Sequence, residues 1–200
     1  MSKENLFRFS GITAVVVGLV MVFFNSATAI VQLPQQLINY RTFLSPFLLI
    51  FAFTGLYAYQ SHKAGLLGLA GYVLAVASLV LNVCFRFSET FIGPVLVEEY
   101  PEAVMSIVQG PYTTVQSITF GLFLAGYVLF GIAALRARIL PPGAAWLLIV
   151  GAIMSFTLVM LPVNIGAILA GVALIWMGYA QYSTATNVSS SFGRRLIAQQ

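Results

Sequence analysis

The chain has 200 residues, of which 60% are hydrophobic and only 7% are charged. A soluble domain carries about a quarter charged residues, so this composition excludes an ordinary soluble protein and predicts an all-α polytopic membrane bundle. The net charge of +4 comes from basic residues scattered among short connecting segments. That distribution is typical of the cytoplasmic face of a membrane protein and argues against a nucleic-acid partner.

The first predicted span covers residues 11–31. This almost wholly apolar run follows a polar start that contains Lys3 and Arg8, and about 20 apolar residues suffice to cross the hydrocarbon core. The basic start and the small residues 27–29 also match a cleavable signal peptide. We favour an uncleaved helix, because the apolar run continues through Val31.

Two further spans are predicted before the middle of the chain. Residues 32–42 include Pro34 and Arg41 and are predicted to form a loop. A short second span follows at residues 43–59. After a tight turn, residues 64–85 form the third span, which is long enough to cross the membrane.

Residues 87–112, called the collar below, are the one long polar interruption of the apolar chain. The collar holds four of the five acidic residues: Glu89, Glu98, Glu99 and Glu102. It is predicted to lie outside the membrane, as a lid over the bundle. Clustered carboxylates can bind Ca²⁺ or a cationic partner, but their spacing matches no defined calcium loop. We therefore favour a solvated acidic surface and predict no metal site.

Three more spans follow the collar, at residues 113–135, 143–161 and 163–181. The last two are separated at Pro162, because proline breaks helices and disfavours helical geometry at the residue before it. The apolar run on either side of this proline is about twice the length that one span needs. A tight hairpin is therefore predicted there.

The basic residues predict the orientation of this six-span bundle. Seven of the nine lysines and arginines fall on one side, and only Arg41 and Arg86 fall on the other. This bias places both termini in the cytoplasm and the collar outside. Residues 1–182 then form a single membrane domain. Residues 183–200 are polar and are predicted to form a flexible cytoplasmic tail.

Polar side chains within the spans gather in the outer half of the predicted membrane region. Such side chains are costly in lipid and normally face the bundle interior or a water-filled cavity. We therefore predict an outward-facing ligand pocket below the collar, with ordinary hydrogen bonding between helices as the alternative. The candidate pocket residues are Asn25, Gln32, Asn82, Arg86 and Gln116.

Arg86 ends the third span and lies three residues before Glu89. One interpretation makes it an anchor for a ligand carboxylate or phosphate. We favour the other, in which it reaches the interface or pairs with Glu89. The single histidine, His62, and the single cysteine, Cys84, exclude bis-histidine haem ligation and a disulfide within the chain. No catalytic residue, metal or cofactor is predicted.

Residues 136–151, from Arg136-Ala-Arg138 through Pro141-Pro142, resemble a loop-to-helix pattern of uncharacterised small multipass membrane proteins of bacteria. The collar segments Glu89–Pro94 and Tyr100–Glu102 resemble the same group. The resemblance implies a protein of the bacterial inner (plasma) membrane and implies no activity. The predicted layout is also similar to that of the substrate-binding subunits of energy-coupling-factor vitamin transporters, which is an analogy of fold alone.

Two functions are compatible with these patterns, and a third is weaker. The leading hypothesis is a non-enzymatic protein that binds a small or amphipathic ligand in the pocket, or serves as an accessory subunit of a membrane complex. The alternative is a structural partner that binds other membrane proteins through its glycine-rich helices or its collar. A membrane enzyme that uses the collar glutamates comes third, because no nucleophile or metal triad accompanies them.

Overall fold

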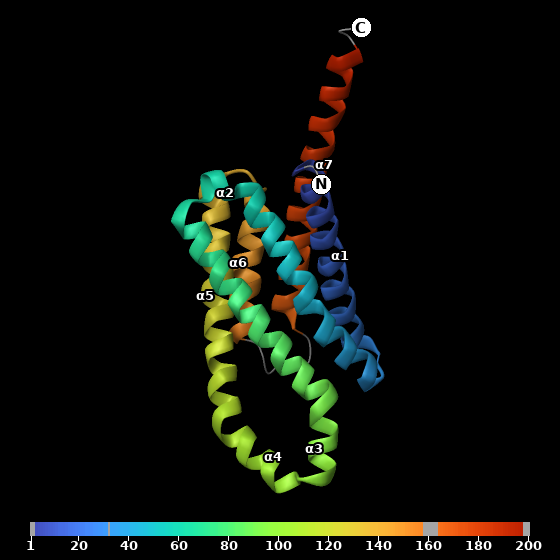
Figure 1. Ribbon diagram of the computed structural model, residues 1–200, viewed down its shortest axis with the longest axis vertical. Coiled ribbons are helices and arrows are strands. Elements are labelled where there is room, and N and C mark those ends of the chain that lie inside the picture. Colours follow the sequence, from blue (N-terminus) through green and yellow to red (C-terminus); the bar gives the residue numbers. More distant parts are fainter. Residues whose placement is uncertain (1–2, 32, 158–163, 198–200) are drawn as a thin grey trace.

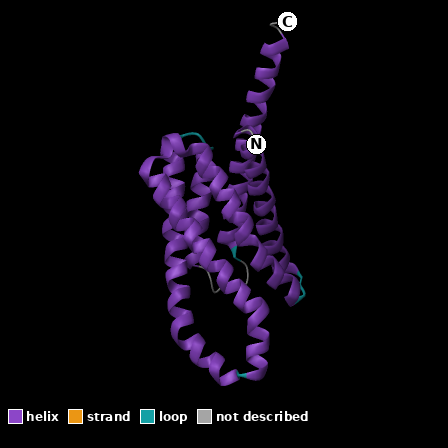
Figure 2. Ribbon diagram, in the orientation of Figure 1, coloured by secondary structure: helices purple, strands orange, loops and turns teal. Residues whose placement is uncertain are grey.

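The computed structural model describes residues 3–31, 33–157 and 164–197, which form helices and no strand (Figure 2). The long helices run side by side as a bundle, and the collar extends beyond them at one end (Figure 1). These helices are α1 (Lys3–Ile30), α2 (Gln35–Phe87), α5 (Thr113–Ala137), α6 (Pro142–Thr157) and α7 (Ile165–Ile197).

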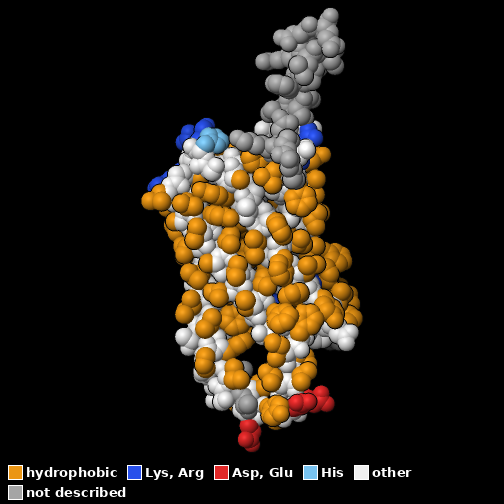
Figure 3. All heavy atoms as spheres, viewed as in Figure 1, with side chains coloured by type: hydrophobic (Ala, Val, Ile, Leu, Met, Phe, Trp, Pro, Cys, Tyr) orange, Lys and Arg blue, Asp and Glu red, His pale blue; other side chains and the backbone are white. Residues whose placement is uncertain are grey.

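Several stretches of the bundle have the length and composition of membrane spans. Within the described residues, four helical stretches are long and apolar enough to cross a membrane: Asn5–Thr28, Gln35–Glu99, Val104–Ala137 and Ile165–Thr186. Helix α6 is apolar but shorter. Large apolar side chains also cover the outside of the bundle (Figure 3). Soluble proteins rarely expose a continuous apolar surface of this extent. The expected all-helical architecture with several long apolar helices is confirmed.

Helix α2 is a hairpin with two arms, at residues 35–64 and 66–87. Gly65 adopts a φ of 59° and a ψ of −160°, a conformation that glycine adopts at little cost, and the chain reverses there (Figure 1). Across the hairpin the rings of Tyr57 and Tyr72 stack with their centroids 4.6 Å apart. The described chain therefore has five long helices where the sequence predicts six spans, because α2 contains the second and the third.

Small residues let neighbouring helices approach closely. A Cβ atom added to Gly18 in α1 would lie 2.5 Å from the backbone oxygen of Gly171 in α7. One added to Gly126 in α5 would lie 2.4 Å from the backbone nitrogen of Ala75 in the second arm of α2. Close backbone contact is a common way to stabilise helix pairs in lipid, where apolar burial gives little driving force.

The collar is helical rather than irregular. Two short elements, η1 (Ser88–Ile92) and α3 (Gly93–Glu99), continue the second arm of α2, and two more, α4 (Pro101–Ile107) and η2 (Val108–Tyr112), lead into α5. The chain breaks at Tyr100, whose ψ is 59°, because the residue before a proline disfavours helical geometry. Acidic side chains gather at the far end of the collar, and basic side chains gather mainly at the opposite end of the bundle (Figure 3).

The predicted loop at residues 32–42 is wrong from Gln35 onward, where α2 begins. The amide Nε2 of Gln35 donates a hydrogen bond of 2.9 Å to Oδ1 of Asn39, one turn along the helix. Such pairs stabilise a helix surface, so the polar residues of this segment do not stop the helix. As a result, Pro46 lies inside a helix rather than in its first turn.

Much of the segment predicted to form a flexible tail is helical in the structure. Helix α7 continues to Ile197, through most of the segment predicted to be flexible. Hydroxyl groups on this part of the helix donate to carbonyl oxygens of the preceding turn, as Ser183 and Thr184 do to Ala180 at 3.0 and 2.9 Å. The chain reverses between α6 and α7, while residues 158–163, and so the predicted break at Pro162, lie outside the described residues.

Candidate functional site

A cavity of about 290 Å³ lies between the helices, in the half of the bundle nearer the collar. Every long helix contributes to its wall. Its apolar and aromatic lining includes Leu49, Leu79, Phe120, Phe123, Tyr127 and Phe156. The polar and charged lining residues are Asn25, Arg41, Thr42, Ser45, Ser78, Asn82, Arg86, Thr119, Ser155 and Asn164.

Three of the five predicted pocket residues meet at this cavity. Asn25 comes from α1, and Asn82 and Arg86 come from the second arm of α2. Gln116 in α5 does not line the cavity, although Thr119 of the same helix does. The fifth residue, Gln32, lies outside the described residues.

The collar glutamates are not brought to the cavity. Of the described residues 87–112, none lines it. Glu98, Glu99 and Glu102 are exposed on either side of the break at Tyr100, at the far end of the collar (Figure 1). The two arms of the collar continue the bundle helices outward and carry these carboxylates away, so the predicted lid is not closed over the cavity.

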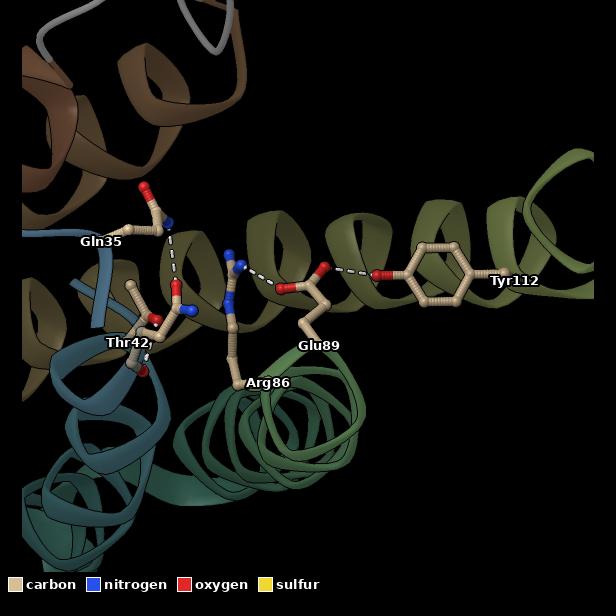
Figure 4. Close-up of polar contacts among 6 residues, drawn as sticks. Gln35, Thr42, Arg86, Glu89 and Tyr112 are labelled. Atoms are coloured by element: carbon tan, nitrogen blue, oxygen red, sulfur yellow. Dashed lines mark hydrogen bonds and ion pairs between the residues drawn. The ribbon is translucent and has the colours of Figure 1, made fainter. Parts of the chain in front are cut away.

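Glu89 instead joins the two sides of the collar at its base. Arg86 Nη1 lies 2.6 Å from Glu89 Oε2, and the hydroxyl of Tyr112 in η2 donates to the other carboxylate oxygen. Figure 4 shows Glu89 between these two side chains, with Arg86 also facing the first arm of α2 near Thr42. The ring of Tyr112 packs edge to face against that of Phe85, with the ring centroids 4.9 Å apart. This polar link holds Arg86 at the rim of the cavity.

Arg41 lines the cavity, although its segment is predicted to be a loop. Its side chain is half-buried and lies over the ring of Phe24, with Cζ 5.5 Å from the ring centroid. Its Nε atom is buried without a hydrogen-bond partner among the described residues. The spacing of Arg41, Ser45 and Leu49 would have placed them on one helix face, had the helix been started at Gln35.

Most hydroxyl groups of the wall bond to their own helix. Ser45, Ser78 and Thr119 donate to backbone carbonyls one turn earlier, at 2.7, 2.7 and 2.8 Å. Their oxygen atoms can still accept a hydrogen bond. The amide of Asn82, by contrast, makes no hydrogen bond with any residue that the structure describes, and it remains able to bind a ligand.

Asn164, which caps the start of α7, also lines the cavity. Its Oδ1 atom accepts from the backbone N–H of Ala167 at 2.9 Å, the geometry of an N-cap. The hydroxyl of Ser155 in α6 donates to the same oxygen at 3.2 Å. The two helices are thereby tied together where they border the cavity.

The cavity thus combines apolar walls with a few polar groups and two guanidinium groups, an arrangement that small-molecule sites commonly use to fix the orientation of a ligand. Its lining offers both hydrogen-bond donors and aromatic and aliphatic surface. No protein-family model, curated protein or solved structure matches the chain.

Proposed function

We propose that this chain is a non-enzymatic membrane protein that binds a small or amphipathic ligand in the cavity between its helices. The observation that carries this proposal is the convergence of Asn25, Asn82 and Arg86 from two helices on one cavity with apolar walls. Polar groups at such depth are costly in a bilayer. A ligand that hydrogen-bonds to them and fills the apolar part offsets that cost.

The proposal includes six membrane spans, with both termini in the cytoplasm and the cavity open to the outside. The hairpin at Gly65 supports two spans within α2. The gathering of basic side chains at the end opposite the collar (Figure 3) supports the orientation, since basic residues concentrate on the cytoplasmic side. A bacterial inner membrane is proposed from the resemblance of residues 136–151.

Replacement of Asn82 by leucine tests the proposed site. The full-length protein in phosphatidylcholine nanodiscs would be titrated with 1-octanol, with the heat of partition into empty nanodiscs subtracted. Wild-type protein is expected to bind 1-octanol saturably, and Asn82→Leu is expected to weaken binding about fivefold, because the amide hydrogen bond is lost.

Gln116→Leu is the matched control, because Gln116 is a partly buried amide near the same depth that does not line the cavity. It is expected to leave the affinity unchanged. Non-saturable binding to the wild-type protein, or equal losses in both variants, would contradict the proposed site.

The collar favours a second candidate function, a docking partner within a membrane complex. Its helices expose apolar side chains beyond the bundle, among them Val95, Val97 and Met105. The glycine-rich faces are less suited to this role, since glycines such as Gly18 and Gly126 already contact other helices of the same chain. Co-purification of a stoichiometric protein in a gentle detergent would favour docking, and a monomer with a bound small molecule would favour the cavity.

A further inference from the structure

We propose that the cavity selects a ligand with an anionic head group, a carboxylate or a phosphate, and that Arg41 is the residue that binds this charge. This inference rests on the proposed ligand-binding function and adds the chemical class of the ligand. It is carried by the position and surroundings of Arg41 and by the balance of charge around the cavity.

Arg41 is a cation without an acidic partner. It makes no ion pair or hydrogen bond with the side chain of any described residue, and its contact with the Phe24 ring compensates only part of its lost hydration. Its Nε–H is buried and unpaired. Charges that have lost part of their hydration in a protein are normally paired, and half-buried Arg41 has no acidic partner among the described residues. A bound anion would supply the missing partner.

The charge of the cavity wall points the same way. Arg86 lines the cavity too, but Glu89 neutralises it. No described aspartate or glutamate lines the cavity, so the wall carries a net positive charge that comes from Arg41. The charges of Arg41 and Arg86 also repel each other. An anion between the two guanidinium groups would relieve this repulsion.

The donors that remain available suit an anion. Arg41 presents a planar fork of N–H groups, which matches the geometry of carboxylate and phosphate oxygens. The Asn82 amide adds a donor without a described partner. Most wall hydroxyls have already donated their protons to backbone carbonyls. The donors of Arg41 and Asn82 come from the two arms of α2, one from each.

The apolar part of the cavity wall indicates that the ligand also carries an apolar group. Phe120, Phe123 and Phe156 border the cavity, and a ligand that was wholly polar would leave this surface without contacts. An acid with an apolar chain or ring satisfies both parts. Such an acid can be a free carboxylate or phosphate ester that enters from water, or the head group of an anionic lipid with part of its chain.

The test compares octanoate with 1-octanol, which share a chain length and differ in charge. Full-length protein in phosphatidylcholine nanodiscs would be titrated calorimetrically with each probe, with empty nanodiscs as the blank. Wild-type protein is expected to bind octanoate about tenfold more tightly than 1-octanol, as charge-assisted hydrogen bonds allow. Arg41→Gln is expected to abolish this preference, and Arg41→Lys is expected to retain part of it.

Lys63→Gln is the charge-matched control, because Lys63 lies near the hairpin turn of α2, at the other end of the bundle. It is expected to leave the preference unchanged. Equal affinities for the two probes in the wild-type protein would overturn the inference, whether or not Arg41→Gln folds, and so would a preference that survives Arg41→Gln. If neither probe binds saturably, the proposed function itself fails.

A second arm of the experiment distinguishes the source of the anion. The octanoate titration would be repeated in nanodiscs in which part of the lipid is phosphatidylglycerol. Competition would assign the cavity to an anionic lipid head group, and undiminished octanoate binding would assign it to a free acid. Both results support an anion site, provided that the preference depends on Arg41.

Discussion

The side chains of Gln60 and Gln181 are both completely buried near the end of the bundle opposite the collar, yet their hydrogen bonding differs. The amide Nε2 of Gln181 donates to Ser10 Oγ at 2.7 Å and to the backbone oxygen of Phe7 at 3.1 Å, which ties α7 to α1. Neither polar atom of Gln60 has a partner among the described residues. Gln181 therefore connects helices through its Nε2, although its Oε1 is buried without a described partner, whereas both polar atoms of Gln60 bear an uncompensated desolvation cost.

This contrast predicts opposite effects for the same substitution. Gln181→Leu is expected to lower the free energy of unfolding by about 1 kcal/mol, a typical value for hydrogen bonds between membrane helices. Gln60→Leu is expected to be neutral or stabilising, because it removes two unpaired buried atoms. Denaturant titration of both variants in the same detergent measures the difference. An equal loss of stability in Gln60→Leu would show that its amide is hydrogen-bonded in solution.

At this scale the sequence predicts some cavity residues better than others. Asn25 and Asn82 could be proposed because amides within long apolar runs must avoid lipid. Gln116 was proposed by the same rule, but α5 is apolar on all sides, and such a helix gives little indication of which face turns inward. Arg41 is not among the predicted pocket residues, because the polar residues after Pro34 are equally compatible with a loop and with a helix that begins at Gln35.

The helices themselves are held together at reciprocal close contacts. Between the second arm of α2 and α5, a Cβ on Gly71 would lie 2.4 Å from the backbone nitrogen of Phe130, and one on Gly126 would lie 2.4 Å from that of Ala75. The two helices therefore meet backbone to backbone at both places. Both helices contribute residues to the cavity wall, among them Asn82 and Phe123, so the close approach here also influences the shape of the cavity.

Alanine substitutions in α5 should separate packing from helix propensity. Gly126→Ala is expected to lower the free energy of unfolding by about 1–3 kcal/mol, because the added methyl group forces α2 and α5 apart. Gly121→Ala is the control, since nothing lies within 4 Å of an added Cβ there. It is expected to be neutral or to stabilise the helix by up to about 1 kcal/mol. Equal melting temperatures for the two variants would argue against the close contact.

Some helix boundaries can be predicted from local sequence, whereas others depend on contacts between helices. The break at Tyr100 could be predicted from Pro101, since the steric rule is local. The reversal of α2 was predicted a little early, in the turn at residues 60–63, whereas the structure uses Gly65 with its positive φ. Gly65 also fits an uninterrupted helix, so its role depends on the tertiary contacts of both arms.

For the whole molecule, composition predicts the class of fold, and the distribution of charged residues predicts the orientation of the bundle in the membrane. The scarcity of charged residues indicates helices in lipid without reference to any motif. Acidic side chains then gather at the collar end of the bundle, and basic side chains gather mainly at the opposite end (Figure 3). The cavity and the collar share one end. The side of the membrane that the collar faces is therefore also the side from which the cavity would be reached.

Cysteine labelling tests this orientation directly. In a Cys84→Ser background, which removes the native exposed thiol, Glu99→Cys would place a thiol near the end of the collar, and His62→Cys would place one near the turn of α2. A membrane-impermeant maleimide added to intact cells is expected to label the first variant, and to label the second only after permeabilisation, because basic ends face the cytoplasm. The reverse pattern would place the cavity on the cytoplasmic side, and Arg41 would then face anions of the cell interior. Equal labelling of both sites in intact cells would contradict a bundle whose two ends lie on opposite sides of the membrane.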